Sequence, residues 1–154
     1  MLIDTGGELH GYQSDITRTF PFRGYSQWQE NMWNTIRAAQ QAALNAIILG
    51  QPMESIDKAA RDVVTAAGYG EGFETFTHRL GHGIGLQGHE EIYAVGGNTF
   101  PITPGMCFSV EPGIYIMGQG GVRIEDIVCV TSTPPYYDMF GPTSDSIDDP
   151  LGGH

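Results

Sequence analysis

The chain has 154 residues, of which 40% are hydrophobic and 16% are charged. This length and composition predict one globular domain and argue against a disordered chain. Seven basic against eighteen acidic residues give a net charge of −11, so we expect no nucleic-acid partner. Since no apolar run is long enough to span a bilayer and no signal peptide pattern opens the chain, we expect a cytoplasmic protein without a membrane partner.

The first half of the chain predicts strands followed by two helices. Residues 1–4 form a short apolar run, and residues 12–20 alternate in the manner of a strand. Over residues 25–49 the apolar positions recur every three or four residues, which predicts a long amphipathic helix stopped by Gly50 and Pro52. A second amphipathic helix is predicted over residues 54–67.

The second half of the chain predicts strands separated by glycine-rich loops. The strand-like segments are residues 77–86, 106–116 and 122–130. Residues 132–154 are rich in Pro, Gly, Ser and Asp, so we expect a flexible tail there. The order of strands, two helices and further strands predicts the α+β class. Cys107 and Cys129 lie in apolar strand-like runs without CxxC spacing, which favours buried free thiols over a disulfide or a zinc site.

Four acidic residues occupy symmetric positions in two predicted hairpins. Asp4 and Asp15 are equidistant from the midpoint between Leu9 and His10, and Glu111 and Glu125 are equidistant from Gly118. Residues directly opposed on paired strands bring their Cβ atoms within ~5 Å of one another, so each hairpin would hold two like charges together.

The alternative is that these acids are ordinary solvent-facing strand residues, which is the commoner situation for any single Asp or Glu. Their apolar sequence neighbours argue against it, because an unpaired charge is costly in such a setting. Two divalent cations would balance four carboxylates. The pattern therefore indicates a site for two metal ions, and Pro112 after Glu111 should break or bulge the strand there.

Three of the five histidines, His78, His82 and His89, fall within twelve residues. Glycines on either side of His82 make a helix improbable, and as a strand the segment would place His78 and His82 on one face. A lone histidine is more often structural than a ligand, but this cluster favours a function in metal binding or proton transfer. Residues 83–88 match the G-x-G-x-x-G pattern of dinucleotide sites only weakly, because no helix follows them.

Five ordered motifs over residues 1–131 resemble those of the pita-bread metallopeptidases, which include Xaa-Pro aminopeptidases, prolidases and methionine aminopeptidases. The amino-acid sequences of the motifs are most similar to those of the Xaa-Pro aminopeptidase and prolidase branch. The motifs are Ile3-Asp4-Thr5-Gly6, residues 11–19, residues 81–86, residues 110–115 and residues 122–126. The resemblance implies a pita-bread fold, a curved antiparallel sheet carrying two long helices, with residues 1–131 as the catalytic domain and residues 132–154 as a tail.

The resemblance also implies a role for each residue of the site. Asp4 would bind one divalent ion, His82 and Glu111 the other, and Asp15 and Glu125 would bridge the two. A hydroxide between the ions would attack the scissile carbonyl of a peptide, and Glu111 would help to move its proton. His78 and His89 would contact the substrate or stabilise the tetrahedral intermediate, and Arg123 would contact the substrate and steady Asp4. Oxygen-rich ligation with one imidazole suits Mn²⁺, Co²⁺ or Zn²⁺, with Mn²⁺ ranked first.

The chain departs from the family pattern at its start. Family members have further sequence before the first metal-binding Asp, which is residue 4 here. We therefore expect a fragment, a partial gene product or a subunit completed by another chain, and an uncovered apolar surface predicts a homodimer or a complementing chain. The alternative function is a catalytically impaired or non-peptidase binding member of the same fold.

Overall fold

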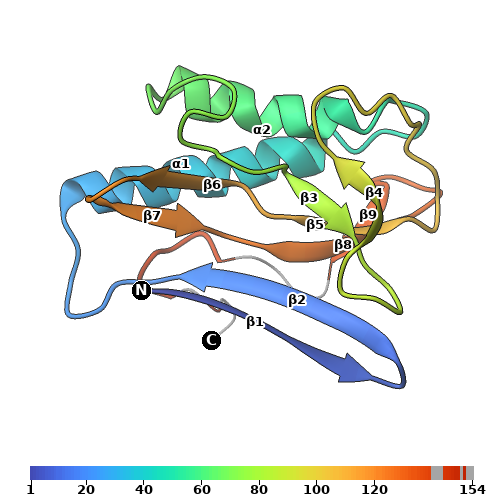
Figure 1. Cartoon of the computed structure of the whole chain (residues 1–154), viewed down its shortest axis with the longest axis horizontal. Helices are drawn as coiled ribbons and strands as arrows, with labels where there is room; N and C mark the ends of the chain where they lie inside the picture. The colour runs from blue at the N-terminus through green and yellow to red at the C-terminus, as the bar shows by residue number, and fades with distance from the viewer. Residues whose placement is uncertain (140–143, 150, 152–154) are drawn as a thin grey trace.

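The computed structural model describes residues 1–139, 144–149 and 151. Two helices lie on one side of the strands, and the β1–β2 hairpin lies on the other side (Figure 1). The predicted α+β class is confirmed. The elements, in chain order, are β1 (Leu2–Leu9), β2 (Tyr12–Thr19), α1 (Gln27–Asn45), α2 (Glu54–Ala66), β3 (Gly81–Gly83), β4 (Glu90–Ala94), β5 (Cys107–Val110), β6 (Gly113–Ile116), β7 (Gly120–Arg123), β8 (Asp126–Val130) and β9 (Tyr137–Met139).

Both predicted helices are present and pack against each other. Helix α1 begins after a capping box in which Ser26 and Gln29 satisfy each other's backbone N–H groups. It ends at Asn45, four residues before the predicted end, although Ile47 beyond it is still buried. The apolar stripe that predicted each helix is its buried face, so the helices form the main hydrophobic core together with β5 and β8.

The β1–β2 hairpin turns one residue later than the symmetry of its aspartates predicted. Leu9 pairs with Tyr12, so the turn consists of His10 and Gly11, which both have positive φ angles. A two-residue turn of this kind favours a glycine and matches the twist of the strands. Asp4 consequently pairs with Thr17, and the prediction that it directly opposes Asp15 is wrong. The pairing moves by two residues, so both aspartates still lie on one face of the hairpin.

Residues 107–130 form one long strand pair with an interruption. Strands β5 and β8 pair in the same register as β6 and β7, and both pairs are centred on Gly118 as predicted. Between the two pairs, neither Glu111 nor Glu125 is part of the ladder formed by these strands. Pro112 lies at this interruption, as expected, because proline cannot donate a ladder hydrogen bond.

The cysteines are paired, which contradicts the prediction of free thiols. Cys107 lies opposite Cys129 on β5 and β8, and the two form a disulfide with Cα atoms 4.2 Å apart. This separation is short enough for a bridge because the two residues occupy directly opposed positions of the ladder.

The five-stranded sheet has the order β4-β3-β5-β8-β9. The predicted strand over residues 77–86 is reduced to Gly81–Gly83, where Gly81 approaches the Ser109 carbonyl too closely for any side chain. Strand β4 was not predicted. Strand β9 and the buried Ile147 belong to the segment 132–154 that was expected to be a tail, of which residues 140–143, 150 and 152–154 lie outside the described residues. Within the described part of the chain, no helix has the length and apolar character needed to cross a membrane.

Candidate metal centre

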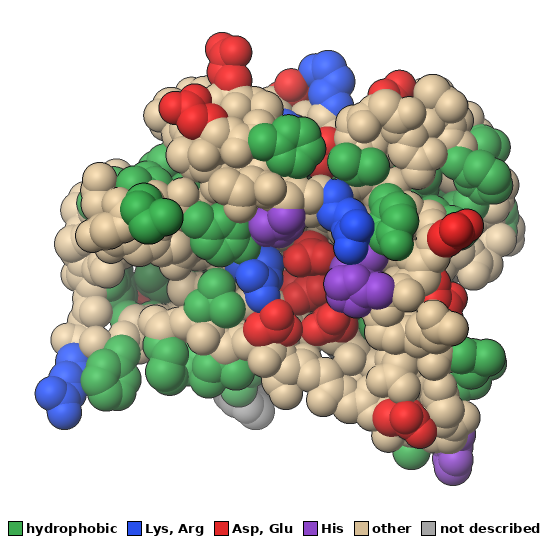
Figure 2. Space-filling model, in the orientation of Figure 1, with side chains coloured by type: hydrophobic (Ala, Val, Ile, Leu, Met, Phe, Trp, Pro, Cys, Tyr) green, Lys and Arg blue, Asp and Glu red, His purple; other side chains and the backbone are tan. Residues whose placement is uncertain are grey.

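A cavity of about 590 Å³ opens between the β1–β2 hairpin and the five-stranded sheet. Figure 2 shows acidic side chains gathered in a hollow at the middle of this face, with basic side chains and histidines beside them. The cavity brings together every residue that the sequence predicted for the metal and substrate site. Its lining includes Asp4, Asp15, His78, His82, His89, Glu111, Arg123 and Glu125.

The four carboxylates reach the cavity from different parts of the fold. Asp4 and Asp15 come from β1 and β2, whereas Glu111 and Glu125 come from the interruption of the long strand pair. Ligand atoms of Asp4, Asp15 and Glu125 lie within 4.8 Å of one another, and so do those of His82, Glu111 and Glu125. Because Glu125 belongs to both groups, cations held by the two groups would be neighbours.

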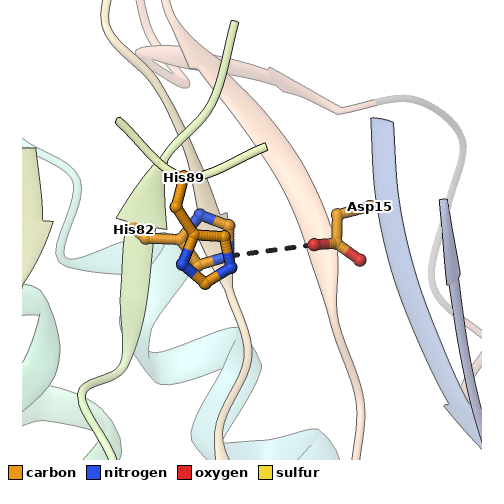
Figure 3. Close-up of side chains that lie close together, drawn as sticks. All are labelled: Asp15, His82 and His89. Carbon is orange, nitrogen blue, oxygen red and sulfur yellow. Dashed lines mark ion pairs between the residues drawn. The ribbon is translucent and has the colours of Figure 1, made fainter. Parts of the chain in front are cut away.

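His82 points a ring nitrogen toward the carboxylates. Its Nδ1 lies 3.0 Å from the Gly83 carbonyl oxygen and donates to it, which leaves Nε2 as an acceptor. Nε2 lies 3.4 Å from Glu111 Oε1 and 3.8 Å from Asp15 Oδ2. His89 stacks on His82 with ring centroids 3.7 Å apart, and both rings face Asp15 (Figure 3). Asp15, His82 and His89 form a third group of ligand atoms within 4.8 Å.

Burial raises the pKa values of three carboxyls in the cavity. Burial, together with neighbouring carboxylates, raises the pKa of Glu111 to about 7 and that of Glu125 to about 8. Burial and the nearby Asp4 also raise the pKa of Asp15. Burial lowers the pKa of His82, so its ring is neutral and available as a ligand at pH 7. Converging oxygen ligands with one neutral imidazole, in a site that disfavours its own negative charge, fit divalent cations.

Arg123 lies beside the carboxylates and connects several of them. Its Nη2 donates to Asp4 Oδ2, its Nε donates to Thr17 Oγ1 over 3.2 Å, and its Nη1 donates to the Tyr115 hydroxyl over 3.0 Å. The guanidinium lies 3.9 Å from Glu111 Oε2. Arg123 therefore orients Asp4 and partly offsets the negative charge of the cavity.

Three further polar side chains at the site were not singled out in the sequence. Thr17 donates to Glu125 Oε2 over 2.6 Å, and Ser109 donates to Glu111 Oε1 over 3.1 Å. The Tyr115 hydroxyl lies 2.9 Å from His78 Nε2. Thr17 and Ser109 each lie two residues from a predicted ligand, and this period-two spacing was the signal that could have found them. Tyr115 lies within a predicted motif, but its contact with His78 depends on the fold.

The sequence matches a known protein family and several known proteins. The profile of metallopeptidase family M24 matches residues 1–132. The Xaa-Pro dipeptidase of Lactobacillus helveticus is 49% identical over 131 residues, which are 85% of this chain and 35% of that protein. The probable dipeptidase PepE of Mycobacterium tuberculosis is 48% identical over 132 residues, 85% of this chain and 34% of that protein. The chain thus spans about a third of the length of these curated relatives.

Solved structures agree with the sequence matches. Dipeptidase PepE from Mycobacterium ulcerans superposes with a TM-score of 0.87 at 43% identity, covering 94% of this chain and 38% of that one. The prolidase from Pyrococcus furiosus superposes with a TM-score of 0.86 at 35% identity, covering 93% of this chain and 41% of that one. The predicted relation to the pita-bread fold is thereby confirmed.

Proposed function

Because the chain belongs to metallopeptidase family M24, and membership of a metallopeptidase family implies divalent metal ions, we propose that it contributes the metal-binding part of a dinuclear Xaa-Pro peptidase. The reaction would be hydrolysis of a peptide bond near the amino terminus of the substrate, as in a prolidase or an Xaa-Pro aminopeptidase. The observation that carries this proposal is the sharing of Glu125 between two groups of converging ligand atoms.

Five side chains would hold the two ions. Asp4 would bind one ion, and His82 and Glu111 would bind the other. Asp15 and Glu125 would bridge them, which is supported by the position of both in more than one ligand group. The oxygen-rich donor set is compatible with Mn²⁺, Co²⁺ or Zn²⁺, and we propose Mn²⁺ as the ion in use. When bound, such a pair of ions lowers the pKa of a water molecule and polarises the scissile carbonyl.

The remaining side chains would manage protons and the substrate. Glu111 is suited to accept and return a proton, because its carboxylate lines the cavity and belongs to one of the two groups of converging ligand atoms. His78 and His89 line the cavity and would contact the substrate around its scissile bond. Arg123 would keep Asp4 oriented through their ion pair. These roles fall within residues 1–131, which we propose as the catalytic portion.

A rival function is a catalytically impaired or non-peptidase binding protein of the same fold. The complete set of proposed metal ligands favours a peptidase instead. Metal binding without hydrolysis would support the rival.

The proposal is tested by assaying the purified chain on Ala-Pro and on Ala-Pro-Ala with added Mn²⁺. We expect hydrolysis that stops on chelation and falls by more than about a hundredfold in Glu111→Ala. Glu30→Ala is the matched control, because Glu30 is a partly exposed glutamate in the first turn of α1, outside the cavity. Metal-dependent hydrolysis that survives Glu111→Ala would refute the assigned site.

The assembly state and the cellular location stay predictions. We propose a homodimer or a complementing chain, and light scattering on the purified chain tests this, since a monodisperse monomer would contradict it. We also propose a cytoplasmic location. Disulfides are rare in reducing compartments, so the redox state of Cys107 and Cys129 in cell extracts bears directly on that location.

A further inference from the structure

Asp57 and Arg61 form a buried ion pair on helix α2, behind the wall of the metal cavity. Arg61 Nε lies 2.9 Å from Asp57 Oδ2, and only 12% of the Arg61 side chain and 2% of the Asp57 side chain are exposed. Charges this deeply buried are costly unless they are paired and hydrogen-bonded. Both side chains lie outside the cavity lining, and their further hydrogen bonds reach the segment that carries the histidines of the cavity.

Arg61 holds the first part of residues 72–96, which we call the histidine segment because it contains His78, His82 and His89. Its Nη1 donates to the Gly72 and Phe76 carbonyls, and its Nη2 donates to the His78 carbonyl over 2.6 Å. The guanidinium also lies 4.1 Å from the centroid of the Phe76 ring. Because both the edge and the face of this planar group are in use, Arg61 fixes the backbone that leads into His78.

Asp57 ties the middle of the histidine segment to its end. Its Oδ1 accepts from the Leu80 N–H over 3.1 Å, and its Oδ2 accepts from the Gly96 N–H over 3.0 Å. Leu80 directly precedes β3, and Gly96 follows the end of β4 by two residues. One carboxylate therefore fixes the point where the chain enters β3 and the point where it leaves β4.

Leu80 connects this carboxylate to two proposed ligands of the same cation. Its carbonyl accepts from the Glu111 N–H over 2.9 Å, and His82 follows Leu80 by two residues. A displacement of Leu80 would therefore move His82 through the chain and Glu111 through this hydrogen bond. The contacts run from α2 to the cavity without interruption.

We propose that Asp57 and Arg61 are positioning residues, which fix the histidine segment so that His82 and Glu111 present their ligand atoms to one cation. This inference rests on the proposed metal-dependent function. The alternative is a pair that only stabilises the fold. Such a pair would change the free energy of unfolding, but its loss would leave the geometry of the folded site unchanged.

Proton NMR of the histidine rings in EDTA tests the inference without metal or substrate. The rings of His82 and His89 are stacked with centroids 3.7 Å apart, so the ring current of each displaces the ring-proton resonances of the other. In Asp57→Asn and in Arg61→Met these resonances should move toward those of His10, which is exposed. Asparagine keeps the shape of aspartate but replaces one of its two acceptor oxygens by a donor.

Mn²⁺ titration by calorimetry is the second readout. Loss of groups that orient metal ligands typically costs ten- to a hundredfold in affinity, so we expect a loss of about tenfold or more in Asp57→Asn and in Arg61→Met. Arg61→Lys should show an intermediate loss, because lysine keeps the charge but cannot bond all of the carbonyls at once. The double variant Asp57→Asn/Arg61→Met leaves no buried charge unpaired and should show the same loss of affinity.

Val64→Ala is the matched control. Val64 is buried on the same helix and lies outside the cavity, so its truncation should lower the free energy of unfolding while leaving the histidine resonances and the Mn²⁺ affinity unchanged. Either readout unchanged in folded Asp57→Asn would overturn the inference. So would equal changes in Val64→Ala, which would mean that general destabilisation is the cause.

Hydrolysis of Ala-Pro separates this inference from the proposed function. If the wild type hydrolyses Ala-Pro and Asp57→Asn binds Mn²⁺ as the wild type does, the peptidase proposal stands and the positioning role is refuted. If no peptide is hydrolysed but both readouts depend on Asp57, the positioning role stands and the peptidase proposal fails. A wild type that binds no Mn²⁺ would overturn both. Circular dichroism checks that each variant is folded, and the double variant keeps the test decisive if a single variant does not fold.

Discussion

Thr17 and Glu125, which are 108 residues apart, are joined by three hydrogen bonds. Their backbones exchange N–H to carbonyl bonds of 3.0 and 3.4 Å, and the Thr17 hydroxyl donates to Glu125 Oε2 over 2.6 Å. The β1–β2 hairpin carries Asp4 and Asp15, and Glu125 belongs to the long strand pair. This link therefore sets the distance between the two halves of the proposed metal centre.

Replacing Thr17 by valine should weaken metal binding by about tenfold or more. Valine keeps the shape of threonine but removes the hydroxyl that orients Glu125, and loss of such supporting hydrogen bonds typically costs ten- to a hundredfold in metal affinity. Mn²⁺ titration by calorimetry measures the effect. Thr17→Ser keeps the hydroxyl and should bind nearly as well as the wild type, so equal losses in both variants would mean that the hydroxyl is not responsible.

Metal-free protein should lose stability as the pH rises from 7 to 9. The folded carboxyls of Glu111 and Glu125 have pKa values raised to about 7 and about 8, above the ordinary value of 4.5. The folded state therefore holds protons that the unfolded state has already released, so stability falls with rising pH until the folded carboxyls have also ionised, just above pH 8. His78 and His82 have lowered pKa values, so both are neutral in either state above pH 7 and do not oppose the trend.

Thermal melting in EDTA at pH 7 and pH 9 measures this slope. Each pKa unit corresponds to about 1.4 kcal/mol, and most of the loss falls between the unfolded pKa and pH 7, so the part that remains between pH 7 and pH 9 is on the order of 1–2 kcal/mol and comes mainly from Glu125. Added Mn²⁺ should raise the melting temperature, and more strongly at pH 8 than at pH 6.5, because metal ions compete with protons for the same oxygens. Glu125→Gln should flatten the slope, whereas a melting temperature independent of pH in both proteins would contradict the prediction.

Much of the site could be predicted because successive side chains of a strand point to opposite faces, so the sequence indicates which residues share a face. The hairpin prediction for Asp4 and Asp15 was wrong by two residues in pairing, yet both side chains still lie on one face. The symmetry of Glu111 and Glu125 about Gly118 is the register that the flanking strands adopt. Local pattern is sufficient for such features, because opposed positions follow from the turn alone.

The remaining features depend on contacts that local pattern does not encode. Cys107 and Cys129 are also equidistant from Gly118, so the same symmetry places them opposite each other, although the absence of a CxxC motif favours free thiols. Strand β4 was missed because it is short and pairs irregularly with β3. The contact of Arg79 with Tyr93 and His89 arises only when β3 and β4 come together.

Loss of the disulfide should destabilise the chain by about 3 kcal/mol. The bridge closes a loop with a sequence separation of 22 residues, and loop closure of this length restricts the unfolded chain by roughly that amount. Urea unfolding of the Cys107→Ala/Cys129→Ala variant, compared with the wild type with and without dithiothreitol, measures the change. The reductant should have no effect on the double variant. A wild type indifferent to the reductant, with two thiols titratable before it is added, would show that the bridge does not form.

Breaking the buried ion pair between Arg18 and Asp126 should lower the free energy of unfolding far more than breaking an exposed pair of the same kind. Arg18 Nη2 lies 2.6 Å from Asp126 Oδ1, with only 10% and 5% of the two side chains exposed. Gln40 on α1 also donates to this carboxylate, and Arg18 Nη1 donates to the Glu125 carbonyl. The pair thus connects the helix layer to the strand end that presents Glu125.

Arg18→Met removes the guanidinium from a buried carboxylate, which should cost about 3–5 kcal/mol. For a chain of this size the melting temperature would fall by roughly 10 °C. Lys58→Met is the control, because it removes an i,i+4 ion pair to Asp62 in which 73% and 63% of the side chains are exposed, and it should cost less than about 1 kcal/mol. Similar losses in the two variants would mean that the buried pair does not stabilise the junction more than an exposed pair would.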